Sequence, residues 1–180
     1  EIGLNADSFA GALRSSLRED ANVVLVGELR DLETIGMAVT AAETGLLVLA
    51  TLHTSGAAAT VDRMVSVFPA GEQTLIRSML STSLCGVVSQ QLVRRVDGKG
   101  MVAAVEVLVN NAAVSNILRE GKTDLLTSVI QSGALVGMQT LDSSLRRLMD
   151  AKLISGGEAY RKAANKAAFE QFRERDDEPA

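Results

Sequence analysis

The sequence contains few of the residues on which several classes of protein depend. Its 180 residues include one cysteine, no tryptophan, one tyrosine and four phenylalanines. Because disulfides and thiolate metal clusters need at least two cysteines, Cys85 supports neither within the chain, and a reducing, cytoplasmic setting fits best. The scarcity of aromatic rings argues against a protein that binds single-stranded nucleic acid by stacking its bases.

Charge of one sign and long apolar runs are also lacking. Eighteen basic residues against 22 acidic ones give a formal net charge of −4, which predicts no nucleic-acid partner and no anionic membrane surface. The long uncharged run from Thr44 to Val61 is interrupted by polar residues, so we expect no membrane span. Since the sequence opens without an initiator methionine or a signal-peptide pattern, we expect the chain to begin inside a larger protein.

The chain does have a large aliphatic fraction. Hydrophobic residues make up 47% of the sequence, which is enough for a sizeable core without a disulfide or a metal. In the first half, helical patterns alternate with short aliphatic runs that read as strands buried on both faces, which indicates an α/β fold. We expect helices over 8–19 (capped by Asp7), 31–43, 57–67 and 72–84, and strands over 23–27 and 46–52.

The second half has a different pattern. Two alternating segments, 87–96 and 101–109, flank a glycine-rich turn and predict a β-hairpin. Helices are expected over 112–120, 123–132, 139–150 and 157–173, the last opening with a capping box from Ser155 to Glu158. We therefore expect an α/β part over residues 1–110, a helical part over 111–173 and a charged tail over 174–180.

Polar residues follow the first expected strand. Glu28 comes directly after Gly27, at the edge where open α/β sheets bind ligands. A carboxylate at this place suits a nucleotide-hydrolysing site, where it positions Mg²⁺ or the attacking water. An acidic residue after a strand is also a common helix cap or surface charge.

A second polar cluster follows the next expected strand, around His53, which is the only histidine. A two-histidine metal site is therefore unavailable, and His53 suits contact with a phosphate or a structural role. If the two strands are neighbours, Glu28 and His53 lie close together. A serine hydrolase is not supported, since we find no Gly-x-Ser-x-Gly elbow and no convincing acid partner for His53 in a catalytic triad.

Two further features have plain structural explanations. Cys85 lies in an apolar helical pattern with Leu80 and Leu84, so we expect it in the core. Arg94 and Arg95 form a small basic patch with Lys99, which we expect to be solvated or to lie between subunits.

Longer motifs resemble a known family. The segment from Leu17 to Asp31 and the segment from Ala41 to Thr54 are similar to the secretion-type ATPase superfamily of type II secretion and type IV pili. Asp62-Arg63, the run Val67 to Pro69, Ser89 to Val93 and Gly137 to Asp142 resemble its PilT-type branch, the twitching-motility ATPases of pilus retraction. The resemblance extends to about Ala163.

The resemblance implies a RecA-like ATPase core over residues 1–110 and a helical subdomain behind it. Glu28 matches the acidic residue of the family's Walker B motif, expected to act on Mg²⁺, through water, and on the hydrolytic water. His53 matches the His box, thought to sense the γ-phosphate of ATP, with Thr51, Thr54 and Arg30 as nucleotide-contacting residues. The implied partners are five further copies in a homohexamer and an inner-membrane pilus platform protein, at the cytoplasmic face of that membrane.

The resemblance also covers a retraction motif. It comprises Ala113, Val114, Ser115, Asn116, Ile117, Leu118, Arg119 and Glu120, matching the family's AIRNLIRE sequence. From the residues alone, Val114, Ile117 and Leu118 share one face of an amphipathic helix that leaves Arg119 and Glu120 exposed. A plain packing helix has the same pattern.

The sequence departs from the family at several places. It has no Gly-x-x-x-x-Gly-Lys-Ser/Thr segment, so the P-loop that cradles phosphates is missing, as are the Asp box and an amino-terminal PAS-like domain. Ser115 stands where the motif has arginine, and Ala21-Asn22 replaces Pro-Asp. We expect the carboxy-terminal portion of a motor ATPase. The alternatives are a secretion or pilus-assembly ATPase, which commonly carries a four-cysteine zinc element, and a non-catalytic assembly module.

Overall fold

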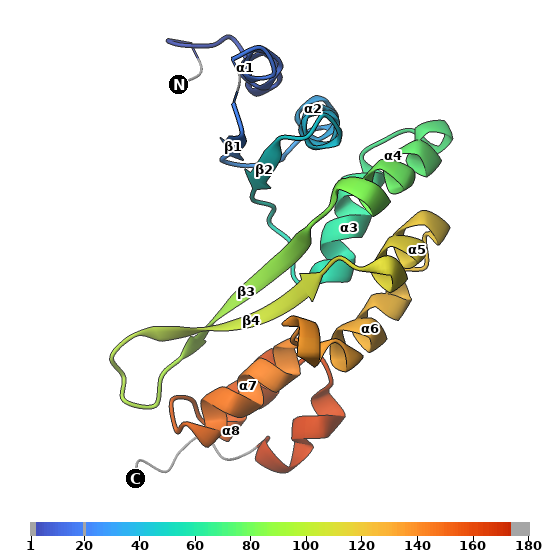
Figure 1. The fold of residues 1–180 in the computed structure, drawn as a ribbon. Helices are drawn as coiled ribbons and strands as arrows, with labels where there is room; N and C mark the ends of the chain where they lie inside the picture. The colour runs from blue at the N-terminus through green and yellow to red at the C-terminus, as the bar shows by residue number, and fades with distance from the viewer. Residues whose placement is uncertain (1–2, 20, 174–180) are drawn as a thin grey trace. The chain divides into compact units, whose positions relative to one another are not determined.

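The computed structural model describes residues 3–19 and 21–173, so the charged tail expected over 174–180 lies outside the described part. The chain forms two compact units (Figure 1). The first unit comprises the described residues of Glu1–Thr54, with Ala58–Cys85 and Asn110–Asp124. The second unit comprises Ser55–Ala57, Gly86–Val109 and the described residues of Leu125–Ala180. These units interleave along the chain, and the functional division at residue 110 stays a prediction.

The first unit alternates helices with two short strands, as the sequence predicts. Its elements are α1 (Phe9–Ser16), β1 (Val23–Val26), α2 (Leu32–Glu43), β2 (Leu47–Ala50), α3 (Ala57–Ser66), α4 (Ala70–Ser83) and α5 (Ala112–Glu120). Helix α3 starts with a residue of the second unit. α2 packs on β2 and α4, and α4 packs on α5. Ile35 on α2 is fully buried, and Ile76 and Leu80 on α4 are nearly so.

Strands β1 and β2 are parallel neighbours, with Val23 opposite Leu47 and Leu25 opposite Leu49. The prediction that both strands are buried on both faces is wrong for the described chain. The four residues just named share one face, and their exposed fractions run from 45% to 75%. A run of aliphatic residues predicts a strand in a covered sheet, but the covering elements are not among the described residues.

The ends of the helices follow local capping chemistry. Asp31 caps α2 as its carboxylate accepts the Thr34 amide at 2.8 Å, which confirms the predicted start of that helix. Helix α1 is capped by Ser8 and not by Asp7, because the Ser8 hydroxyl accepts the Gly11 amide at 3.0 Å. The prediction of Asp7 as the cap was wrong by one residue.

The second unit contains the predicted hairpin and a layer of helices (Figure 1). Strands β3 (Gly86–Arg94) and β4 (Met101–Val109) pair antiparallel over their whole lengths. The remaining elements are η1 (Thr123–Leu125), which ends in this unit, α6 (Leu126–Ser132), η2 (Ala134–Val136), α7 (Leu141–Asp150), α8 (Gly156–Lys162) and η3 (Lys166–Phe172). α7 packs on β4 and α8 packs on β3, so the helices cover one face of the hairpin.

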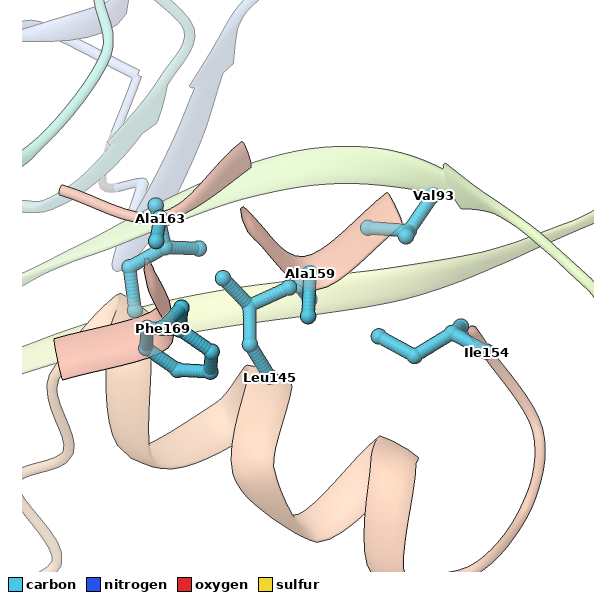
Figure 2. Close-up of a cluster of buried hydrophobic side chains, with 8 residues drawn as sticks. Val93, Leu145, Ile154, Ala159, Ala163 and Phe169 are labelled. Carbon is cyan, nitrogen blue, oxygen red and sulfur yellow. The ribbon is translucent and has the colours of Figure 1, made fainter. Parts of the chain in front are cut away.

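The core of the second unit lies between this hairpin face and the helices (Figure 2). Val93, Leu145, Ala159 and Phe169 are all fully buried. Because they come from β3, α7, α8 and η3, their contacts join all four elements. Burial of this kind is the main source of stability in a small unit.

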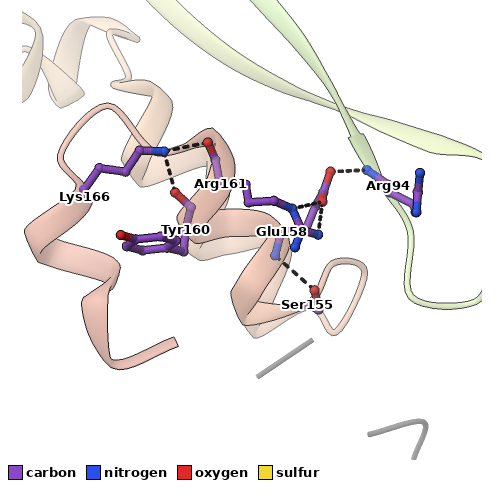
Figure 3. A network of polar contacts seen from close by, with 6 residues as sticks. All are labelled: Arg94, Ser155, Glu158, Tyr160, Arg161 and Lys166. Atoms are coloured by element: carbon purple, nitrogen blue, oxygen red, sulfur yellow. Dashed lines mark hydrogen bonds and ion pairs between the residues drawn. The ribbon is translucent and has the colours of Figure 1, made fainter. Parts of the chain in front are cut away.

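A polar network ties α8 to the hairpin (Figure 3). The Ser155 hydroxyl accepts the Glu158 amide at 3.1 Å, which confirms the predicted cap, and Glu158 accepts the Arg94 amide at 3.2 Å. The single helix expected over 157–173 is wrong, because α8 ends at Lys162 and a separate turn, η3, begins at Lys166. The Asp142 carboxylate accepts the two amides of Ala164 and Asn165, which stabilises the break.

Cys85 is exposed, not part of the core. Helix α4 ends at Ser83, so the helical periodicity that placed Cys85 with Leu80 does not reach it.

No helix in the described part of the chain is long and apolar enough to cross a membrane.

Candidate functional site

The chain segments that follow β1 and β2 are held together beyond the strands themselves. The Leu29 amide donates to the Thr51 carbonyl at 2.9 Å. The Thr51 hydroxyl donates to the Gly27 carbonyl. These two bonds bring the carboxyl ends of both strands to one edge of the sheet.

Glu28 and His53 meet at this edge, as the sequence predicts. His53 Nε2 lies 3.1 Å from Glu28 Oε1, and Arg30 binds the other carboxylate oxygen at 2.5 Å. The side chain of Glu28 is 22% exposed, whereas those of His53 and Arg30 are 83% and 76% exposed. The carboxylate is therefore partly enclosed by two cationic or cation-forming groups that remain open to solvent.

The surroundings of Glu28 favour its charged form. The hydrogen bond from Arg30 lowers the pKa of the Glu28 carboxyl, and the charges of Arg30 and His53 lower it further against the opposing effect of partial burial. Glu28 is consequently an anion at neutral pH. Because the group borders solvent, these ion pairs add little to stability and leave the carboxylate available to a ligand.

Asp31 has the structural role that was the alternative for Glu28. Its two carboxylate oxygens accept the amide and the hydroxyl of Thr34, at 2.8 and 3.0 Å. The hydrogen bond from the Thr34 amide is the main cause that lowers the pKa of Asp31, and the bond from the Thr34 hydroxyl lowers it further. Since Asp31 caps α2, Glu28 is not needed as a helix cap.

The other residues predicted to contact nucleotide are hydrogen-bonded within the protein. Thr51 binds Gly27 as described, and the hydroxyls of Thr54 and Thr60 lie 2.8 Å apart. Arg30 and Thr51 are exposed, and Thr54 is half-buried. Their role toward a nucleotide stays a prediction.

Mg²⁺ keeps several waters and takes one or two carboxylates plus substrate phosphates. The single anionic carboxylate of Glu28 at a strand end fits that requirement. Among residues 3–19 and 21–173, no group of three or more histidine, cysteine, aspartate or glutamate side chains could form a metal cage. Glu28 is thus the residue that would hold the ion, and it would do so with phosphate and water.

The predicted retraction motif forms α5. Val114, Ile117 and Leu118 are at most 8% exposed, while Arg119 and Glu120 are exposed, which confirms the predicted faces. The helix starts at the Asn111 cap and ends at Gly121, whose φ of +70° suits glycine. On the outer side, Glu120 binds Asn116 at 3.0 Å and Lys122 at 2.8 Å.

Ser115, which stands in place of the motif's arginine, faces α4. Its hydroxyl donates to the carbonyl of Ser81 at 2.7 Å and lies 3.2 Å from Asn110 Oδ1. Arg119 lies 3.4 Å from the Ser81 hydroxyl. The buried Ser81 is therefore the point on α4 where α5 is attached.

Sequence reasoning missed Ser81 and also two residues of the hairpin, Ser89 and Glu106. They are directly opposite each other in the β3–β4 register. Glu106 had a recognisable signal, because it is the only charged residue in the strand from Met101 to Val109. A lone carboxylate in an apolar strand needs a partner.

Comparison with known families identifies the family of the chain. The family model described as type II/IV secretion system protein matches residues 5–170. The chain belongs to this family. Its α/β fold agrees with the resemblance found in the sequence.

Members of the family include close relatives of the chain. A protein of Neisseria gonorrhoeae named twitching motility protein is 58% identical over 92% of this chain and 44% of its own length. The type IV pilus retraction ATPase PilT of Pseudomonas aeruginosa is 52% identical over 91% of this chain and 47% of its own length. A crystal structure of the pilus retraction motor PilT with bound ADP matches with a TM-score of 0.85 and 41% identity, over 95% of this chain and 48% of that one.

The chain thus spans about half the length of the relatives it matches. The relatives and the solved structure named above are proteins of twitching motility and pilus retraction. What these relatives bind and drive as whole proteins bears on this chain only as a proposal.

Proposed function

We propose that the chain is the carboxy-terminal portion of a hexameric motor ATPase that hydrolyses ATP to drive type IV pilus retraction and twitching motility. The observation that supports it best is the meeting of Glu28 and His53 at the sheet edge, 3.1 Å apart. The names of two relatives, a twitching motility protein and a pilus retraction ATPase, point to the same activity.

In this proposal Glu28 acts on the hydrolytic water and on Mg²⁺ through water, while His53 responds to the γ-phosphate. Bound Mg²⁺ would supply charge neutralisation for the phosphates. Thr51, Thr54 and Arg30 line the same edge. Because the sequence has no P-loop, most phosphate contacts would come from residues outside this chain.

The proposed partners are further copies of the protein in a homohexamer and an inner-membrane pilus platform protein, at the cytoplasmic face of that membrane. Helix α5 is the candidate retraction element. Its exposed side carries Asn116, Arg119 and Glu120. We propose no nucleic-acid partner, in keeping with the net charge of −4.

The central test is ATP hydrolysis by the full-length protein. Glu28→Gln removes the charge at nearly constant shape, and we expect kcat to fall by at least about a hundredfold, a size typical of lost acid–base function. Glu33→Gln is the matched control, since Glu33 is an exposed residue in the first turn of α2. Full activity of Glu28→Gln would refute the role of Glu28.

A secretion or pilus-assembly ATPase is the alternative within the superfamily. The single cysteine argues against it, because no four-cysteine zinc element can form in this chain. Complementation separates the two. We expect the full-length protein to restore twitching to a piliated strain that lacks its retraction ATPase. Restored pilus assembly or secretion without twitching would favour the alternative.

A non-catalytic assembly module is the alternative from another class. For the 180 residues alone, we expect no micromolar binding of Mg·ATP in calorimetry, because the P-loop is missing. A Walker A lysine in the parent protein, upstream of this sequence, would exclude the non-catalytic alternative. Its absence there would support that alternative.

A further inference from the structure

The segment that follows His53 is attached to the hairpin by two side chains. Ser89 on β3 and Glu106 on β4 are register partners on the face of the hairpin that the helices cover. The Gly56 amide donates to the Ser89 hydroxyl at 2.8 Å, and the Ala57 amide donates to Glu106 Oε1 at 2.8 Å. One cross-strand pair therefore binds two consecutive amides.

These contacts lie where the chain passes from the first unit to the second. Thr54 is the last residue of the first unit in this stretch, and Ser55 is the first residue of the second unit. His53 precedes the anchored Gly56 by only three residues. The length of free chain between the candidate catalytic edge and its anchor is thus very short.

The backbone conformation of the anchored segment favours glycine at position 56. Gly56 has a φ of +98°, a region that other residues rarely adopt, and a Cβ at this position would lie 3.5 Å from Glu106 Oε1. Ala57 is fully buried and Ser89 is 9% exposed. The two hydrogen bonds are therefore shielded, which makes their loss costly.

The charge of Glu106 is also placed favourably. Ala57 begins α3, and the first turn of that helix contains no acidic residue of its own. An anion near the amino end of a helix interacts favourably with its dipole. Glu106 thus supplies from another strand what a local acidic residue supplies in α2, where Glu33 occupies the first turn.

We propose that Glu106, together with Ser89, is a positioning residue for the segment that follows His53, because the two side chains hold Gly56 and Ala57 and so restrict the chain three residues after His53. This inference rests on the proposed ATPase function for its consequence, but the anchoring itself is independent of it.

The anchoring is tested by amide hydrogen exchange of the peptide covering residues 51–60. We expect Glu106→Ala to speed hydrogen exchange of the Gly56 and Ala57 amides about tenfold or more. A tenfold faster exchange corresponds to a loss of about 1.4 kcal/mol in the free energy of local opening. Glu106→Gln keeps an oxygen acceptor and is expected to restore most of the protection. Unchanged exchange in Glu106→Ala, or equal exchange in both variants, would overturn the inference.

The consequence is tested by steady-state ATP hydrolysis of the full-length protein. We expect Glu106→Ala to lower kcat about tenfold with KM for ATP changed less than about twofold, because misplacing a catalytic group affects the chemical step first. Glu106→Gln should lie within about threefold of wild type. Ser89→Ala should act in the same direction, and its effect should not add to that of Glu106→Ala, since both side chains hold one segment.

Glu158→Ala is the matched control. Glu158 also accepts a backbone amide within the second unit, that of Arg94, but far along the chain from His53. We expect it to leave exchange of residues 51–60 and kcat unchanged. If Glu106→Ala does not fold, the inference is tested with Glu106→Gln and Ser89→Ala. A Ser89→Ala variant with the same kcat and the same exchange rates as the wild type would overturn the inference.

The two hypotheses fail differently. An inactive wild-type protein, or full activity of Glu28→Gln, contradicts the proposed function and leaves the exchange test standing. An active wild type with an inactive Glu28→Gln and an unaffected Glu106→Ala contradicts the positioning role alone.

Discussion

The second unit buries its hydrophobic core between a hairpin and helices, whereas one face of the sheet in the first unit is exposed. Leu145 and Phe169 of the second unit are fully buried, while Leu25 on β1 is 75% exposed. Both units consist of strands and helices. The difference is that the helices of the second unit cover one face of a hairpin whose strands have nine residues each, while β1 and β2 have four residues each.

Glu28 of the first unit differs in a similar way from two glutamates of the second unit. In the second unit, the carboxylates of Glu106 and Glu158 accept hydrogen bonds from backbone amides and so have structural roles. In the first unit, Glu28 forms ion pairs with two solvent-exposed side chains, those of Arg30 and His53. Chemistry is thus expected at the open edge of the first unit, and stability is expected from the second.

The largest effect should come from the closed core. Phe169→Ala removes a fully buried ring, and we expect it to lower the free energy of unfolding by about 3–5 kcal/mol. Urea denaturation measures the change. Phe9→Ala in the first unit is the control, because Phe9 is 53% exposed and should cost less than about 0.5 kcal/mol. Equal losses would erase the contrast between the units.

Local sequence was sufficient to predict most of the first unit. Alternating helical and aliphatic patterns gave α2, β2 and α4 closely, since each depends on its own caps and periodicity. The meeting of Glu28 with His53 followed from one further assumption, that consecutive strands pair. The buried face of α5 followed from its periodicity alone.

Contacts distant in sequence could not be predicted. Glu106 is separated from Ala57 by 49 positions and Ser115 from Ser81 by 34, and no periodicity links such residues. The open face of β1 was also missed, because an aliphatic run predicts a covered strand without showing which residues cover it. Cys85 was misplaced because the pattern continued past the end of α4.

The next largest effect concerns the helix layer of the first unit. Gly121 ends α5 with a φ of +70°, and Gly121→Ala should lower the free energy of unfolding by about 1–2 kcal/mol, the cost of a left-handed backbone for alanine. The added Cβ would also lie 3.0 Å from Arg77 Nε. Gly71→Ala is the control in α4, where nothing lies within 4 Å, and it should be neutral or slightly stabilising.

The attachment of α5 to α4 gives a smaller effect. Ser115→Ala removes the hydrogen bond to the Ser81 carbonyl, and we expect a loss of about 1 kcal/mol in thermal or urea unfolding. Asn116→Ala, on the exposed side of the same helix, should change stability by less than about 0.5 kcal/mol. A larger loss for Asn116→Ala would mean that the outer side of α5, not Ser115, holds the helix in place.

The smallest effects compare one arginine–carboxylate pair from each unit. The hydrogen bonds from Arg95, first, and from the Lys99 amide lower the pKa of Asp97 to about 2, and Arg30 lowers the pKa of Glu28 below its ordinary value of 4.5. Carboxyl ¹³C NMR titration should show the Asp97 pKa rising toward 3.8 in Arg95→Ala and the Glu28 pKa rising toward 4.5 in Arg30→Ala. Arg63→Ala is the control for both.

The sign of the pH dependence follows from these directions. A carboxyl whose pKa is lower in the folded than in the unfolded state stabilises the fold above its unfolded pKa, and this contribution is lost as the pH falls through the folded value. For Asp97 the loss falls between pH 3.8 and about 2, and for Glu28 it falls below pH 4.5. Both contributions are small because the pairs border solvent. The lowered pKa of Glu28 also keeps its carboxylate charged, as the proposed chemistry requires. Arg30→Ala should therefore move the acidic limb of the pH–activity profile to higher pH, while it changes the free energy of unfolding little.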